Sequence, residues 1–264
     1  MTDFGKERYL FLWSPDEAVQ RSIEQIGTSA CGATAVINAI SALNLWDRSG
    51  LSSYDANSAV STVLRVENAW IVEYLRSRSC AGATHLNIIN GIDVLMGGIV
   101  KAEFYSFEEI IADNGDFIHW CFNMIKRGSA LILTMNLQKI SPSGDEMWVA
   151  DAWHHQMVFG VDLKDRRLFM TNPLSVMTES ELTTVLKSDS TLMVRSVDVM
   201  KRLDSSINID DTAAILNDIS PLWRELDVGS RFTTLVREYQ ENEKPRYLVI
   251  PAAYRTGVTV VTKS

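Results

Sequence analysis

Cysteine, proline and long apolar runs are all scarce in this 264-residue sequence. Its three cysteines, Cys31, Cys80 and Cys121, are odd in number and widely spaced, which argues against a disulfide framework and favours a reducing, cytoplasmic compartment. The longest apolar stretches, such as residues 130–133, are strand-sized and fall short of the roughly 18 residues that a membrane helix needs. No apolar segment follows the charged residues 1–8, so we expect a soluble protein without a secretory signal.

Positive charge is also in the minority. The sequence holds 25 lysines and arginines against 33 aspartates and glutamates, a formal net charge of −8, and no basic run alternates with aromatic residues. Nucleic acid is therefore not an expected partner. The motifs CxxC and HExxH are missing as well, so we expect no metal and no cofactor. The remaining composition, 46% hydrophobic and 22% charged, is that of an ordinary globular protein.

Helical periodicity dominates the first half of the chain, and strand patterns dominate the second. This order predicts an α+β fold in which helices pack on an antiparallel sheet. Capping-box spacings at Ser106 and Thr178 each predict the start of a helix. Further helices are expected from residue 31 onward and over 57–77, 85–96, 117–127, 211–219 and 230–243. Strands are expected over 9–13, 101–105, 130–135, 155–161, 168–171, 247–250 and 258–262.

The segment around Cys31 has the features that a nucleophilic cysteine requires. Cys31 lies in the first turn of a predicted apolar helix, where unpaired backbone amides and the helix dipole favour a thiolate. Gln25, six residues upstream, is placed to donate its side-chain amide to a developing oxyanion. The alternative is that Cys31 is a small buried hydrophobe, which is how we interpret Cys80 and Cys121.

A nucleophilic cysteine needs a base, and the sequence offers four histidines. His154 and His155 begin an apolar strand, whereas His85 and His119 fit helical patterns and are interpreted as structural. Neighbouring residues of a strand point to opposite faces, so we expect only one of the pair to face Cys31.

The base in turn needs a group that orients its ring. The strand over 168–171 returns antiparallel to the histidine strand and ends at Asn172, which we expect to lie beside the histidine. Alternatively, Asn172 and Pro173 are only a strand-ending turn.

Together these residues resemble the papain-like cysteine peptidases, and most closely the compact bacteriocin-processing peptidases. In that pattern a Gln precedes Cys-Gly by six residues, a His-led apolar strand ends in Gly-x-Asp, and Asp or Asn before Pro closes the next strand. The sequence departs from it at Ala33, where the family usually has Pro, and in having Asn in place of the Asp of that branch. The resemblance covers roughly residues 20 to 175. The matching residues, in the family's order, are Gln25, Cys31-Gly32, His154 with Gly160 and Asp162, and Asn172-Pro173.

The resemblance implies a fold and a chemistry. The fold is the papain-like one, with the nucleophile helix of an N-terminal helical half packed on an antiparallel sheet. Cys31 would attack the carbonyl of a peptide or isopeptide bond, Gln25 would stabilise the oxyanion, and a histidine oriented by Asn172 would carry the proton. The family's six-residue spacing from His to Gly favours His154 over His155.

Two other functions are compatible with the same residues. One is an acyltransferase of the same fold, similar to transglutaminases or phytochelatin synthases, in which an amine or thiol replaces water. The other is a non-catalytic peptide-binding module that has kept the fold. In each case the expected partner is a peptide or protein.

The resemblance leaves the end of the chain unexplained. We expect residues 1–203 to form the catalytic domain and residues 204–264 to form an extension of helices and strands packed on it. Residues 247–250 and 258–262 look like a loop-linked pair of strands that extends or covers the histidine-bearing sheet. The alternative is a separately folded appendage that docks a partner.

Overall fold

The computed structural model describes residues 8–138, 153–204, 206–241, 243 and 247–264. The chain is a mixture of helices and strands built on an antiparallel sheet, as the sequence predicted. Residues 1–7, most of the segment in which we expect no secretory signal, lie outside the described ranges. Within those ranges, no helix has both the length and the apolar character needed to cross a membrane.

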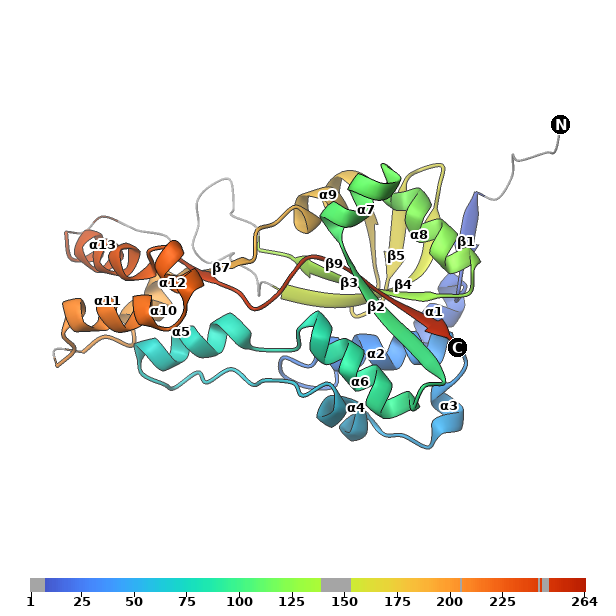
Figure 1. The fold of residues 1–264 in the computed structure, drawn as a ribbon, viewed down its shortest axis with the longest axis horizontal. Coiled ribbons are helices and arrows are strands. Elements are labelled where there is room, and N and C mark those ends of the chain that lie inside the picture. Colours follow the sequence, from blue (N-terminus) through green and yellow to red (C-terminus); the bar gives the residue numbers. More distant parts are fainter. Residues whose placement is uncertain (1–7, 139–152, 205, 242, 244–246) are drawn as a thin grey trace.

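A seven-stranded sheet forms the centre of the molecule (Figure 1). Its strand order is β2-β9-β3-β4-β5-β6, with β1 beside the far end of β4, and every neighbouring pair is antiparallel. The last strand of the chain thus lies between β2 and β3. The strands are β1 (Tyr9–Phe11), β2 (Val100–Ser106), β3 (Ala130–Asn136), β4 (Trp153–Asp162), β5 (Arg167–Met170), β6 (Ser175–Thr178) and β9 (Gly257–Lys263).

Helices cover both faces of this sheet. Figure 1 shows α2, α4 and α6 on one side and α7, α8 and α9 on the other. Each side holds its own apolar core, and β3 is buried along its whole length because it contributes to both. The helices of these layers are α1 (Pro15–Arg21), α2 (Cys31–Ala42), α3 (Trp46–Ser49), α4 (Ser53–Ala59), α6 (His85–Met96), α7 (Phe107–Asn114), α8 (Phe117–Lys126) and α9 (Glu179–Leu186).

A third core lies beside the sheet, at the left of Figure 1. It is built around a two-stranded sheet and includes the fully buried Phe232 and Leu216. Its members come from residues 71–80 and from the stretch 191–251. They are α5 (Ile71–Cys80), β7 (Thr191–Arg195), α10 (Ser196–Met200), α11 (Ile209–Asp218), α12 (Pro221–Glu225), α13 (Val228–Gln240) and β8 (Tyr247–Pro251).

The helix predicted over residues 57–77 is wrong in its middle. The structure has α4 and α5 there, and residues 60–70 between them form no helix. The backbone of this connection forms hydrogen bonds with residues of α5 and the segment after it. Val63 and Gly82 exchange two hydrogen bonds of 2.8 Å, and the Val66 amide donates to the Ser77 hydroxyl. Contacts with distant residues therefore replace the helical bonds that the periodicity predicted.

The two terminal strands do not pair with each other, so the prediction of a linked pair is wrong, but one of them does extend the histidine-bearing sheet. β8 pairs with β7 in the small sheet, whereas β9 fills the position between β2 and β3 in the central sheet. Five of the seven residues of β9 are buried, and an apolar strand of this kind is suited to the middle of a sheet.

Truncation after Leu203 is expected to prevent folding. It removes β9 from between β2 and β3, which leaves two long strand edges unpaired, and it removes most of the third core. We expect the 1–203 fragment to aggregate or to show no cooperative thermal transition in calorimetry. A soluble fragment with a sharp transition would contradict this and would favour a separate appendage.

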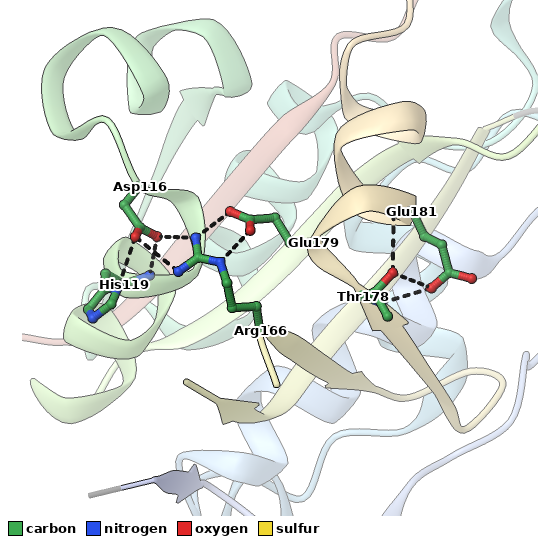
Figure 2. Close-up of polar contacts among 6 residues, drawn as sticks. All are labelled: Asp116, His119, Arg166, Thr178, Glu179 and Glu181. Carbon is green, nitrogen blue, oxygen red and sulfur yellow. Dashed lines mark hydrogen bonds and ion pairs between the residues drawn. The ribbon is translucent and has the colours of Figure 1, made fainter. Parts of the chain in front are cut away.

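Capping boxes begin α7 and α9 at the predicted residues. The Ser106 and Thr178 hydroxyls accept hydrogen bonds from the backbone amides of Glu109 and Glu181, and each glutamate carboxylate accepts one from the backbone amide of the capping residue. Figure 2 shows the pair of Thr178 and Glu181. Both predictions are confirmed. The local sequence was sufficient to predict these helix starts.

Arg166 connects three elements at the turn between β4 and β5. Its guanidinium donates to Asp116 at the start of α8, at 2.9 Å, and to Glu179 at the start of α9 (Figure 2). Burial acts to raise the pKa of Asp116, but hydrogen bonds from Arg166 and His119 outweigh it and hold that pKa well below its usual range.

Arg166→Met is therefore expected to reduce the pH dependence of stability. Because the folded-state pKa of Asp116 is depressed, the stability that it contributes is present above its unfolded pKa of about 3.9 and is lost as the pH falls below that value toward the folded-state pKa. Urea unfolding at pH 6 and at pH 3.5 should show a smaller difference in the variant than in the wild type. Arg224→Met, which breaks an exposed pair with Asp218, is the control and should leave that difference unchanged.

Candidate active site

A cavity of about 290 Å³ lies where the central sheet meets the third core. Four of the five predicted site residues line it: Gln25, Cys31, His154 and His155. The fifth, Asn172, lies behind the histidines and contacts one of them. The structure thus brings together residues that are far apart in the sequence.

Cys31 is the first residue of α2, as predicted. Every residue of this helix is buried, because alanines and other small side chains allow it to pack tightly under the sheet. The preceding residue is Ala30, whose side chain cannot cap the helix, and its first turn holds no acidic residue. The amides of the first turn therefore keep their partial positive charge for the cysteine and for a bound substrate.

Gly32 allows α2 to approach the histidine strand closely. A Cβ atom at this position would lie 2.9 Å from the Ala83 Cβ and 3.5 Å from the His155 ring. A larger residue would therefore push the start of α2 away from the cavity wall. The glycine after the cysteine is needed for packing whether or not the cysteine reacts.

A backbone carbonyl holds the ring of His154 through its Nε2. Its Nε2 lies 2.6 Å from the carbonyl oxygen of Asn172. A carbonyl only accepts hydrogen bonds, so Nε2 carries the proton of the neutral ring, and Nδ1 is the nitrogen with a lone pair. The half-buried ring is therefore in the tautomer that can take a proton at Nδ1.

His155 has both ring nitrogens engaged in a fully buried site. Its Nε2 lies 2.7 Å from the Ala83 carbonyl, and its Nδ1 lies 3.0 Å from the Thr134 hydroxyl. Burial, together with the nearby His154, lowers the pKa of His155 to about 4, so it is neutral at pH 7. These bonds are those of a structural histidine that connects β3, β4 and the segment before α6.

We expected only one of the two histidines to face Cys31, but both line the same cavity as Cys31. The cavity lies at the start of β4, where residues from both faces of a strand can border it. Hydrogen bonding, and not strand alternation, distinguishes the two rings.

Asn172 orients His154 through its backbone and not, as expected, through its side chain. The carbonyl makes the contact, while the buried side-chain Nδ2 has no hydrogen-bond partner among the described residues. Gln156 holds the residues on either side in place, since its Nε2 donates to the carbonyls of Thr171 at 2.9 Å and Pro173 at 3.0 Å. The turn is therefore a rigid support for the imidazole.

Gln25 lines the cavity from the segment before α2. Its Nε2 donates one hydrogen bond, 2.8 Å long, to the carbonyl of Gly27. An amide nitrogen carries two hydrogens, so this bond fixes the side chain and leaves a second donor for another acceptor.

Sequence reasoning missed four other side chains of the cavity wall: Arg65, Arg78, Trp153 and Tyr254. Tyr254, from the link between β8 and β9, stacks on Trp153 with a centroid distance of 5.4 Å and donates to the Ala81 carbonyl. Burial first, and then the nearby Cys31 and Cys80, raise its pKa well above the usual range, so the phenol keeps its proton. The end of the chain thus forms part of the cavity, which no local motif indicated.

The remaining cysteines and histidines do not line the cavity. Burial raises the pKa of Cys121 and of Cys80, so both are protonated thiols at pH 7. His85 stacks on Phe104, and burial followed by the charge of Arg255 lowers its pKa. His119 was expected in a helical core pattern, but its side chain is 55% exposed and pairs with Asp116.

In the part of the chain that the structure describes, no group of three or more His, Cys, Asp or Glu residues is arranged to hold a metal ion.

Neither a protein-family model nor a curated protein matches this sequence. The functional assignment therefore depends on the arrangement of the side chains themselves.

Proposed function

We propose that this protein is a papain-like cysteine hydrolase that cleaves a peptide or isopeptide bond in the cavity around Cys31. One observation carries the proposal: Cys31 begins α2 in the same cavity as His154, whose Nε2 is bound to the Asn172 carbonyl so that Nδ1 is the basic nitrogen. Nucleophile, base and orienting group are the three parts that thiol acyl transfer requires.

In the proposed mechanism the Cys31 sulfur attacks the substrate carbonyl while His154 takes the thiol proton at Nδ1. The Cys31 amide and the Gln25 side chain donate to the oxyanion that forms. The Asn172 carbonyl accepts the Nε2 hydrogen bond throughout and so favours the charged imidazolium. His154 then protonates the leaving amine, and water hydrolyses the thioester and regenerates the thiol.

The compartment and the partner follow from the same chemistry. All three cysteines are thiols, and a thiol nucleophile works best in a reducing compartment, so we expect cytoplasmic activity. The expected partner is a peptide or a protein segment extended enough to enter the cavity. The hydrolase proposal includes neither a metal nor a cofactor.

Product analysis with a peptide library tests this proposal. The wild-type protein should release new amino termini, which mass spectrometry detects. With added cadaverine, amide adducts in place of new termini would instead support an acyltransferase. Peptides that bind to the protein but are not converted would contradict the catalytic proposal and favour a binding module.

A further inference from the structure

Two side chains of β4 hold the turn that follows β5. His154 and Gln156 are two positions apart in the strand, so their side chains point to the same face of the sheet. The His154 Nε2 donates to the Asn172 carbonyl over 2.6 Å. The Gln156 Nε2 donates to the carbonyls on either side of it, those of Thr171 at 2.9 Å and Pro173 at 3.0 Å. Three successive carbonyls of the turn are thus bound by one strand.

Gln156 makes these bonds in a site closed to water. The residue is 3% exposed, and its amide nitrogen carries two hydrogens, one for each of the two flanking carbonyls. The Ser175 hydroxyl, at 3.3 Å, is a more distant third acceptor. Because hydrogen bonds are stronger in such a site than in water, a rotation of the Asn172 carbonyl that weakens them is unfavourable.

The backbone of Asn172 needs such support. Its φ of 58° lies in the left-handed region, which residues other than glycine seldom occupy. Asparagine adopts this conformation more readily than most residues, but the conformation persists only where the surroundings hold it. The bonds from Gln156 to both neighbours of Asn172 are contacts of this kind, and they fix the direction of the carbonyl that binds the His154 ring.

Other contacts hold the end of β5 independently of Gln156. The Thr171 amide donates to the Met157 carbonyl at 2.9 Å, and the Asn38 side chain of α2 donates to the Thr171 hydroxyl at 3.2 Å. Both contacts end at Thr171 and do not reach Asn172. Loss of the Gln156 amide should therefore loosen the Asn172 carbonyl while the strand stays paired.

We propose that Gln156 is a positioning residue of the reaction, which fixes the Asn172 carbonyl and through it keeps the His154 proton on Nε2. The inference rests on the hydrolase proposed above and adds to it a residue that does not line the cavity. The bound carbonyl keeps Nδ1 as the basic nitrogen and favours the charged ring once the thiol proton has moved. A looser carbonyl should therefore reduce the share of Cys31 that is thiolate.

Gln156→Met tests this role because it nearly keeps the shape of the side chain and removes both donor hydrogens. Iodoacetamide, which forms an S–C bond at the thiolate and releases iodide, measures the thiolate of Cys31. At pH 6.5 the folded variant should react about tenfold more slowly than the wild type, as expected when a hydrogen bond to a charged group is lost. At pH 9.5 the two rates should be nearly equal, because the thiol then ionises without the imidazolium.

Asn136→Leu is the matched control. Asn136 is also buried, and its Nδ2 donates to the Thr191 carbonyl at 3.2 Å and to the Ser188 hydroxyl at 2.8 Å, neither of which belongs to the turn after β5. This variant should lose stability and keep the wild-type dependence of alkylation on pH. Equal slowing in Asn136→Leu and Gln156→Met would show that the loss of any buried amide is enough, and would contradict the inference.

The ring tautomer separates this inference from the proposed function. Nitrogen NMR signals of the His154 ring in Cys31→Ala protein should show the proton on Nε2, and Gln156→Met should add the other tautomer. If Cys31 of the wild type reacts no faster than Cys80, the hydrolase proposal fails, yet this change of tautomer would still show that Gln156 positions the ring. An unchanged tautomer together with an unchanged alkylation profile in folded Gln156→Met would overturn the inference.

Should Gln156→Met fail to fold, the wild-type protein provides the test. Protonation of His154 on lowering the pH should shift the side-chain amide signals of Gln156, because both side chains bind the same three carbonyls. The amide signals of Asn136 should not follow that titration. Gln156 signals that stay constant while the His154 ring titrates would contradict the inference.

Discussion

Replacing Cys31 with alanine is expected to abolish conversion of peptides and to leave the fold nearly intact. Removal of the nucleophile from a catalytic group that acts as a unit reduces turnover by about 10⁴-fold or more. The cost in stability should be small, on the order of 1 kcal/mol, because α2 remains packed by its other buried residues. Product release by mass spectrometry and urea unfolding measure the two effects.

Cys121→Ala is the matched control for this experiment. Cys121 is also buried, but it lies in α8, and burial raises the pKa of its thiol. It should lose stability by a similar or larger amount and retain full turnover. If the Cys31→Ala protein still converts peptides, Cys31 is not the nucleophile.

Exchanging each of the adjacent histidines for glutamine is expected to give opposite results. His154→Gln should slow alkylation of Cys31 and peptide conversion by about 10²-fold to 10⁴-fold, the usual contribution of a general base. Its stability should change little, because the ring is only half-buried and water can replace it at the Asn172 carbonyl.

His155→Gln should instead lower stability. Two buried groups, the Ala83 carbonyl and the Thr134 hydroxyl, lose their hydrogen bonds to the His155 ring. Each buried polar group left unpaired lowers the free energy of unfolding by about 1–3 kcal/mol. At a temperature where this variant is folded, Cys31 should react at close to the wild-type rate. A large loss of reactivity in folded His155→Gln, with none in His154→Gln, would reverse the assignment of the base.

Local signals in the sequence predicted α2, which begins at Cys31, and the histidine strand β4 well. The small residues after Cys31 are typical of a tightly packed helix, and the capping boxes at Ser106 and Thr178 specify helix starts within four residues. The antiparallel return from β4 to β5 placed Asn172 near His154, because hairpin register follows from a short turn.

What the sequence could not predict depends on contacts between distant residues. The connection over residues 60–70 loses its helical pattern because Val63 pairs with Gly82. The position of β9 between β2 and β3, and with it the placing of Tyr254 in the cavity wall, follows from how these three strands pair and not from the sequence of any one of them. Arg65 and Arg78 belong to no motif, so only the folded chain shows that they share a wall with Cys31.

The most direct test of the account is a labelling comparison of the three cysteines in the folded wild-type protein. Iodoacetamide is added at pH 6.5, where an ordinary thiol with a pKa of about 8.5 is almost entirely protonated, and the modification of each cysteine is followed by peptide mapping. A thiol paired with His154 at the start of α2 should react at least about tenfold faster than Cys80 or Cys121. Equal labelling of all three cysteines would contradict the claim that Cys31 is an activated nucleophile.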